Sequence, residues 1–329
     1  MNEKRHPLIA KDSPWLAPLA GFSDLPFRLL CREHGCSVAC TEMVSAKGLV
    51  YGGPGTGNLL DTSPQDTPLV VQLFGAEPEF IEKAMGILLE RGYEYFDLNS
   101  GCPVKKVTKT GAGAALHNDV DRLEAIVAVM AKLAPGRTGV KFRLGWAAGE
   151  ENYLEIGKRM EQAGASWLSL HPRHAKQGYS GTANWDALAE LVGAVETPVI
   201  ASGDLFTAED GVRCIEETGV SGVMFARGAL YGPHIFERFR ALMHGETPIT
   251  PDGPAIADMI RRHAELAREY FQGRKALVKM RTIVPRYVRD TPGSRILRSR
   301  VVACTSWEEL DEIVTDFLCR QPEDTDGAL

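Results

Sequence analysis

The stretch GVKFRLGWAAGEENYLEIGKRMEQAGASWLSLHP, residues 139–172, places two short apolar segments on either side of a longer amphipathic one. GVKFRLG (139–145) and SWLSLHP (166–172) have the length and composition of buried strands. ENYLEIGKRMEQAGA (151–165) repeats its apolar residues at helical spacing. The stretch therefore predicts a strand–helix–strand unit, from which α/β folds are built.

The same alternation continues over most of the chain. Six further strand candidates are WLAPLA (15–20), VACTEMV (38–44), LVVQLFG (69–75), YFDLNSG (95–101), PVIASGD (198–204) and GVMFARG (222–228). Eight strand–helix repeats within one domain predict an α/β protein with a TIM (β/α)8 barrel, and an open doubly wound sheet is the competing arrangement.

Polar or conformationally special residues end nearly every strand candidate. They are Glu42, Gln72, Asn99 with Cys102, Lys141 with Arg143, His171 with Arg173, Ser202 with Gly203 and Asp204, and Arg227 with Gly228. In a TIM barrel the carboxyl ends of all strands open on one face, where the chemistry takes place. The set therefore favours the barrel and predicts a site at its mouth.

The chain divides into a large and a small part. Residues 1–244 hold the strand–helix repeats, and GETPITPDGP (245–254) is rich in Gly and Pro and indicates a linker. Residues 255–319 predict a small helical domain, and the polar stretch 320–329 predicts a disordered tail.

The small domain is strongly basic. Residues 255–301 contain twelve Lys and Arg against four Asp and Glu, a net of +8, whereas the whole chain has a net charge of −6. A concentrated positive charge favours a polyanionic partner, because each neutralised phosphate releases counterions. The alternative is an ordinary solvated helical face.

Composition and cysteine usage indicate a cytoplasmic globular protein. The 329 residues are 44% hydrophobic and contain neither a signal-peptide pattern nor the roughly 18 to 20 consecutive apolar residues that span a bilayer, so no membrane association is expected. An odd number of cysteines, seven, argues against a disulfide framework. Cys31, Cys36 and Cys40 come close to an iron–sulfur spacing, but core packing is the favoured interpretation, and no metal site is predicted.

Cys102 stands between a glycine and a proline in DLNSGCPVKK, residues 97–106. A thiol in apolar surroundings keeps its proton at neutral pH, which suits a proton donor as well as a buried structural cysteine. Lys105 and Lys106 could lower the pKa of the thiol, which keeps a nucleophile as a third reading. The residues alone leave these three alternatives open.

Two segments near the end of the barrel predict a phosphate site. SGD (202–204) and ARG (226–228) follow the seventh and eighth strand candidates, where TIM barrels commonly bind a ligand phosphate. Glycine lets backbone N–H groups approach the phosphate, and Arg227 supplies a forked donor. GGPGTG (52–57) and KTGAGAAL (109–116) do not have the spacing of a dinucleotide or P-loop motif.

Several motifs together resemble the tRNA-dihydrouridine synthase family, in the family's order and over roughly residues 14–240. They are APLAGFSDLPFR (17–28), TEMVSAKGL (41–49), VQLFG (71–75), DLNSGCPVKKV (97–107), GAGAAL (111–116), VKFRLGW (140–146), LHPRHAKQGYSGTANWD (170–186), PVIASGD (198–204) and VMFARGAL (223–230). The element N-x-G-C-P followed by K-K-V is the most specific of them.

The resemblance implies an FMN enzyme that uses NADPH, or alternatively NADH, to reduce the C5–C6 bond of particular uridines in tRNA. The residues it implies for FMN are Pro18, Leu19, Ala20, Gln72, Lys141, His171, Ser202, Gly203, Asp204, Ala226 and Arg227. Lys141 would stabilise the reduced flavin electrostatically. The resemblance assigns no role to His174.

For the substrate, the resemblance implies that Cys102 donates a proton to C5 and that Asn99 lies near the uracil. We further expect Arg173, at the barrel mouth, and Arg295 and Arg298, in the basic segment, to contact tRNA. No obligatory protein partner is predicted. A small-molecule flavin dehydrogenase and a catalytically idle RNA-binding protein are the competing functions.

Overall fold

The computed structural model describes residues 6–53, 55–289 and 293–319. Within these ranges eight parallel strands pair in the order β2-β1-β9-β8-β7-β6-β5-β4, and β2 also pairs with β4, so the sheet closes. The strands are β1 (Trp15–Leu16), β2 (Val38–Cys40), β4 (Leu69–Phe74), β5 (Tyr95–Ser100), β6 (Thr138–Arg143), β7 (Trp167–His171), β8 (Val199–Ala201) and β9 (Gly222–Phe225). The barrel prediction is confirmed, and the open sheet is excluded.

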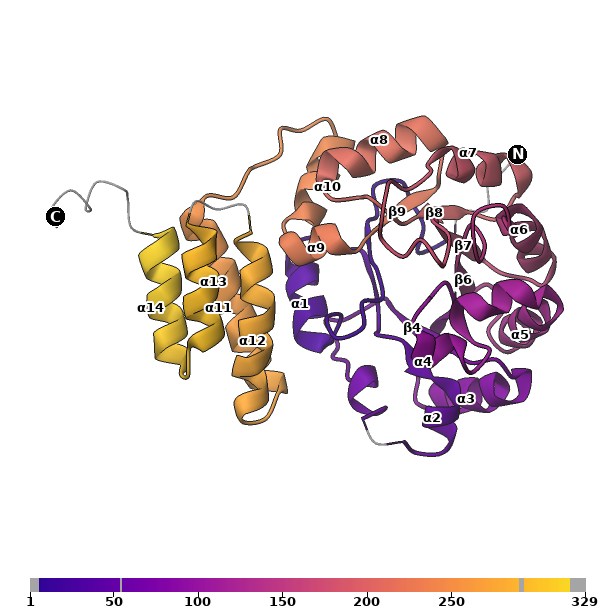
Figure 1. Ribbon diagram of the computed structural model, residues 1–329, viewed down its shortest axis with the longest axis horizontal. Helices are drawn as coiled ribbons and strands as arrows, with labels where there is room; N and C mark the ends of the chain where they lie inside the picture. Colours follow the sequence, from indigo (N-terminus) through magenta and orange to yellow (C-terminus); the bar gives the residue numbers. More distant parts are fainter. Residues whose placement is uncertain (1–5, 54, 290–292, 320–329) are drawn as a thin grey trace, which may run out of the picture.

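Helices surround the barrel (Figure 1). Those that return the chain between strands, or follow the last strand, are α1 (Leu25–Glu33), α3 (Pro78–Glu90), α5 (Val120–Leu133), α6 (Tyr153–Gln162), α7 (Asp186–Ala194), α8 (Ala208–Thr218) and α10 (Ile235–Met243). Shorter elements lie in the loops: β3 (Val44–Ser45), α2 (Ala46–Val50), η1 (Asn58–Leu60), α4 (Lys105–Thr108), η2 (Gly113–Asn118) and α9 (Arg227–Tyr231). Strand β3 was not predicted, because two residues are too few to show a periodicity.

The lower part of the barrel interior is filled by two tryptophans. Trp15 and Trp167 are fully buried and meet edge to face, with ring centroids 5.6 Å apart. Gly139 faces the indole of Trp167, and a Cβ built there would lie 1.9 Å from its Nε1. Lys141 follows Gly139 by two residues on β6, so it points into the barrel one layer nearer the mouth.

Four helices follow the barrel in the described part of the chain: α11 (Gly253–Tyr270), α12 (Arg274–Tyr287), α13 (Ser294–Ala303) and α14 (Trp307–Leu318). They form a bundle beside α1 and α9 (Figure 1). Helix α11 begins inside the stretch expected to be a linker, because Asp252 caps it by accepting a 2.9 Å hydrogen bond from the Ala255 N–H. The expected tail, 320–329, lies outside the described residues. None of the described helices has the length and apolarity that a membrane span requires.

Basic residues of the bundle hold it against the barrel. Arg262 forms a 2.7 Å ion pair with Glu33 of α1. Lys279 donates to the Gly21 carbonyl at 2.5 Å and pairs with Asp24. The guanidinium of Arg286 lies over Phe22, 4.5 Å from its centroid, and that of Arg289 lies over Tyr231 at 4.1 Å. Part of the basic charge of residues 255–301 is therefore directed at the barrel and not at solvent.

Three cysteines with a cluster-like spacing occupy the core. Cys31 and Cys36 are buried among the helices outside the barrel, whereas Cys40 is buried with Trp15 and Trp167 inside it. The favoured interpretation, core packing, agrees with this placement.

Candidate active site

One pocket at the mouth of the barrel collects most of the predicted cofactor residues. It lies among the ends of β1, β6, β7, β8 and β9. Nine predicted residues line it: Pro18, Leu19, Lys141, His171, Ser202, Gly203, Asp204, Ala226 and Arg227. Ala20 is exposed just beyond the pocket, and Gln72 is buried inside the barrel. The closed barrel therefore brings together side chains from positions 18 to 227 of the sequence.

The β8 end of the pocket is a tight turn. Gly203 has a φ of +128°, and a Cβ there would lie 2.6 Å from the His171 ring. Gly228 lets α9 approach the loop after β8, since a Cβ there would lie 2.6 Å from the Leu205 carbonyl oxygen. Only glycine fits these two positions without displacing backbone or ring atoms.

Arg227 supplies the charge at this end of the pocket. Its guanidinium lies over the rings of Tyr179 and Phe206, 4.8 and 4.7 Å from their centroids, and donates to Asp204 at 3.2 Å. The ring of Tyr231 stacks on that of Phe206. The side chain of Arg227 remains partly exposed, so it is both oriented and accessible to an anion.

Arg173 was expected to contact substrate, but its side chain is buried and holds neighbouring loops together. Its side chain is about 1% exposed, and it donates to the Ser180 and Gly181 carbonyls at 3.2 and 2.7 Å and to Asp204 at 2.6 Å. The N–H groups of its guanidinium are bonded to the loop after β7 and to Asp204. We therefore infer that Arg173 positions this loop and Asp204 and does not contact RNA.

A buried polar network crosses the barrel beneath the pocket. The Gln72 amide donates to Asp97 at 2.6 Å, and the Asn99 amide donates to the Gln72 oxygen at 2.8 Å. Lys141 reaches the pocket from β6. Burial raises the pKa of Asp97 to about 6, against the hydrogen bond from Gln72 and the charge of Lys141. Burial also lowers the pKa of Lys141 to about 8, against the charge of Asp97.

Asn99 shapes the turn that carries Cys102. Its side-chain oxygen accepts hydrogen bonds from the N–H groups of Gly101 and Cys102, at 3.2 and 2.9 Å. The Cys102 carbonyl in turn accepts from the Ala114 N–H at 3.0 Å. The turn is therefore held on both sides, and its thiol remains half-buried at the mouth.

The thiol of Cys102 keeps its proton at neutral pH. Burial raises its pKa, against a hydrogen bond from the Val104 backbone and the charge of Arg143. Lys105 and Lys106, which the sequence analysis considered for lowering this pKa, are exposed on α4, and the cation that acts on the thiol is Arg143. A proton donor fits this state better than a nucleophile does.

Arg143 is a residue to which sequence reasoning gave no role. It is about 3% exposed and donates to the Gly101 carbonyl at 2.8 Å, and to the His174 and Gly178 carbonyls at 3.1 and 3.0 Å. It thereby ties the Cys102 turn to the loop after β7. Its position at the end of β6 was visible in the sequence, but its backbone partners were not, because they come from other loops.

Three more site residues were missed. Asp97 precedes Asn99 by two positions on β5, so strand alternation could have placed both on the inward face. Tyr179 and Phe206 lie in loops without periodic signal, and only the folded chain brings their rings to Arg227.

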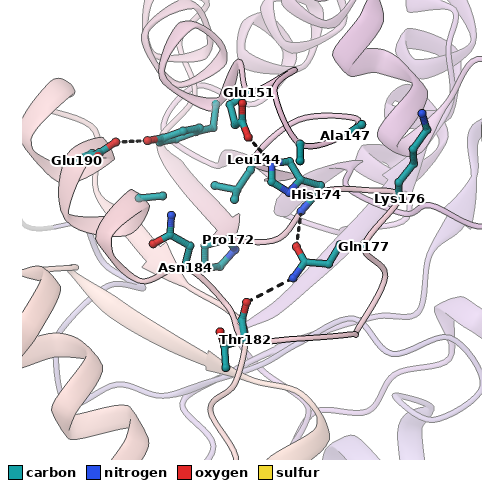
Figure 2. Close-up of a pocket in the computed structure, with 13 residues that line it drawn as sticks. Leu144, Ala147, Glu151, Pro172, His174, Lys176, Gln177, Thr182, Asn184 and Glu190 are labelled. Atoms are coloured by element: carbon teal, nitrogen blue, oxygen red, sulfur yellow. Dashed lines mark hydrogen bonds and ion pairs between the residues drawn. The ribbon is translucent and has the colours of Figure 1, made fainter.

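His174 lies at a different cavity, of about 920 Å³, between α6, α7 and the loop after β7. Figure 2 shows its ring directed at Glu151, to which it is bonded at 2.7 Å, while its backbone N–H donates to Gln177. This cavity shares no lining residue with the pocket at the mouth. His174 is thus separate from the predicted cofactor residues.

Arg295 and Arg298 are exposed on α13. They lie in the bundle and not at the barrel mouth, so the structure separates the expected tRNA contacts from the pocket.

Together these features define a (β/α)8-barrel enzyme whose mouth carries a half-buried lysine, a protonated thiol and a pocket with Arg227 at one end. The sequence matches the family model described as dihydrouridine synthase (Dus) over residues 15–321. The chain therefore belongs to the dihydrouridine synthase family.

Relatives with that name match over nearly their whole length. The probable tRNA-dihydrouridine synthase 1 of Synechocystis is 35% identical, covering 92% of this chain and 87% of the relative. The probable tRNA-dihydrouridine synthase of Treponema pallidum is 35% identical, covering 94% of each chain. The tRNA-dihydrouridine synthase B of Xanthomonas campestris is 31% identical, covering 87% and 86%.

Solved structures share the fold at low identity. An old yellow enzyme homologue from Zymomonas mobilis superposes with a TM-score of 0.50 at 14% identity, covering 73% of this chain and 90% of its own. A 2-naphthoyl-CoA reductase gives a TM-score of 0.54 at 10% identity, covering 71% and 50%. At these identities the likeness shows the barrel fold alone.

Proposed function

We propose that this protein is a tRNA-dihydrouridine synthase that reduces the C5–C6 bond of uracil in particular uridines of tRNA, with FMN as cofactor and NADPH, or NADH, as reductant. The observation that carries the proposal is the protonated thiol of Cys102, held by Asn99 at the mouth of a barrel whose pocket has the partly exposed Arg227 at one end. The names of the relatives support it.

The residues present fit FMN. The turn at Gly203, where a Cβ would collide with His171, and the guanidinium of Arg227 form a donor set suited to the phosphate. Pro18 and Leu19 form the β1 side of the pocket, and Lys141 is the cation within it. Gln72 lies beneath, where its amide is already bonded to Asp97.

When bound, the flavin supplies the hydride for C6 of uracil. The chain's own residues provide the rest. Lys141 offers a positive charge in a desolvated pocket, where it stabilises negative charge more strongly than it would in water. Cys102 delivers the proton to C5 as a general acid, a role that typically contributes roughly 10²- to 10⁴-fold. Asn99 aims the thiol by holding the turn through its side-chain oxygen.

A uridine in folded tRNA must leave its stack to reach Cys102. This costs a few kcal/mol, which contacts to phosphates and to the shape of the RNA offset. The exposed Arg295 and Arg298 of α13 are suited to such contacts, because a guanidinium binds phosphate with a forked geometry.

The experiment uses the purified full-length protein. We expect flavin absorbance near about 450 nm at roughly one FMN per chain, bleaching on addition of NADPH, and dihydrouridine in an unmodified tRNA transcript incubated with both. Dihydrouridine is then mapped in tRNA from cells that lack the protein, which identifies the target position.

Two results would overturn the proposal. Reduction of free uracil or orotate as fast as of tRNA would identify a small-molecule dehydrogenase. A protein that binds tRNA but stays colourless after reconstitution with FMN would be an RNA-binding protein without catalysis.

A further inference from the structure

A second basic surface lies on the barrel itself, directly after Cys102. It consists of Lys105 and Lys106 on α4 and of Lys109, and all three are exposed. The chain contains no Asp or Glu between Leu98 and Asn118. Within the part of the chain that the structure describes, no acidic side chain lies within ion-pair distance of these lysines. We call these three residues the α4 lysine surface.

This surface is fixed relative to the thiol. Val107 of α4 is about 6% exposed and packs with Ala76 and Ala112. Gly113 lies so close to the Cys102 turn that a Cβ there would be 2.7 Å from the Cys102 carbonyl oxygen and 2.8 Å from Val107. Three residues of chain span at most about 11 Å, so Lys105 cannot lie far from Cys102.

The α4 lysine surface lies on the side of the mouth opposite the bundle. In the closed ring of strands, β5, which leads to α4, is three strands from β1 and four from β9. The bundle packs on α1 and α9, which follow β1 and β9 (Figure 1). The two basic surfaces therefore flank the mouth on opposite sides.

An RNA that inserts one base at Cys102 must pass its backbone over both sides of the mouth. We propose that the α4 lysine surface binds the RNA phosphates next to the target nucleotide, so that the tRNA is held from two sides, by the bundle and by α4. Val104, which is 57% exposed beside these lysines, offers an apolar contact to a neighbouring sugar or base. This inference rests on the proposed function.

The test compares two triple variants of the FMN-loaded enzyme. One is K105Q/K106Q/K109Q, and the matched control K11Q/K132Q/K158Q removes the same charge from exposed lysines elsewhere on the barrel. We expect the first to weaken tRNA binding by roughly tenfold at physiological salt and to reduce the slope of log K against log salt by roughly 2, because about 0.7 counterions are released per phosphate contact. The variant K105R/K106R/K109R, which keeps the charge, should have the tRNA affinity and the salt slope of the wild type.

Reduction of the bound flavin by NADPH is measured in the same variants and should stay at the wild-type rate, which verifies an intact pocket. Equal salt slopes for the first variant and the control would overturn the inference and identify a solvated helical face, while tRNA reduction by the wild type would leave the proposed function standing. If the wild type neither binds nor modifies tRNA, this result contradicts both the proposed function and the inference about the α4 lysine surface.

Discussion

The barrel mouth and helix α13 both carry concentrated charge, but they use it in opposite ways. At the mouth and just beneath it, Asp97 and Arg143 are buried and Lys141 is half-buried, and burial shifts the pKa of each. On α13, Arg295 and Arg298 project into solvent. Chemistry at one atom requires charges of fixed position in a low-dielectric site, whereas holding a long polyanion requires only enough charge along its path.

Helix α12 has basic side chains that are neither inside the barrel nor directed at solvent, because they contact the surface of the barrel. Its Lys279 and Arg286 are directed at Phe22 and Asp24 of the barrel, next to the β1 side of the pocket. Arg289, just beyond the helix, lies over Tyr231. We therefore propose catalysis, domain docking and RNA binding as the roles of basic residues at these three places, and the effects of substitutions there should differ in size and in what they affect.

The largest effect is expected from Cys102→Ala. It should slow uridine reduction by roughly 10²-fold or more, because the general acid is lost, while FMN stays bound and NADPH still reduces it. Stopped-flow absorbance follows the flavin, and dihydrouridine in a transcript follows the product. Equal loss of flavin reduction and of uridine reduction would mean that Cys102 is structural. The proposal that the mouth holds a proton donor would then be contradicted.

Lys141→Met should slow reduction of the flavin by roughly tenfold, which corresponds to about 1.4 kcal/mol of lost stabilisation. Since the pKa of Lys141 lies at about 8, its ammonium is present below that pH and lost above it. Reduction by the wild type should therefore slow as pH rises through about 8, whereas the rate of the Met variant should be flat there. Lys141→Arg keeps the charge and serves as the control; a pH profile shared by all three proteins would contradict the assignment.

Lys279→Met tests the docking of the bundle. The variant loses the hydrogen bond to Gly21 and the ion pair with Asp24, of which the ion pair is largely shielded from water, so the free energy of unfolding should fall by about 1 to 2 kcal/mol. Denaturant titration measures it. Lys275→Met, on the exposed face of the same helix, should leave the stability within about 0.5 kcal/mol of the wild type. Equal losses in both variants would refute a specific docking role for Lys279.

The smallest effect is expected from Arg295→Gln with Arg298→Gln. The double variant should weaken tRNA binding a few-fold and flatten its salt dependence by roughly 1 to 2, without changing flavin reduction or stability. Titrations of labelled tRNA at several salt concentrations measure the slope. An unchanged slope would move the RNA-binding surface away from α13.

Much of the fold could be predicted from the sequence, because strand length and helical spacing are local properties. The eight barrel strands follow from short apolar runs, and the positions of Cys102 and Lys141 follow from where those runs end. The boundary at Gly253 was misjudged because the Asp252 cap and Pro254, which start a helix, also resemble a linker. Arg173 was misjudged because a strand-end position does not show whether a side chain turns towards the pocket or into the loops.

By itself, the sequence determined the barrel, the order of its elements and the kinds of side chain that end its strands. Only the tertiary structure decided the partners of those side chains: that Arg173 and Arg143 fasten loops, and that Asp97 lies in one network with Gln72. It also decided which bundle cations meet the barrel. A helical period defines two faces but not which of them is docked, and that choice depends on residues far away in the chain.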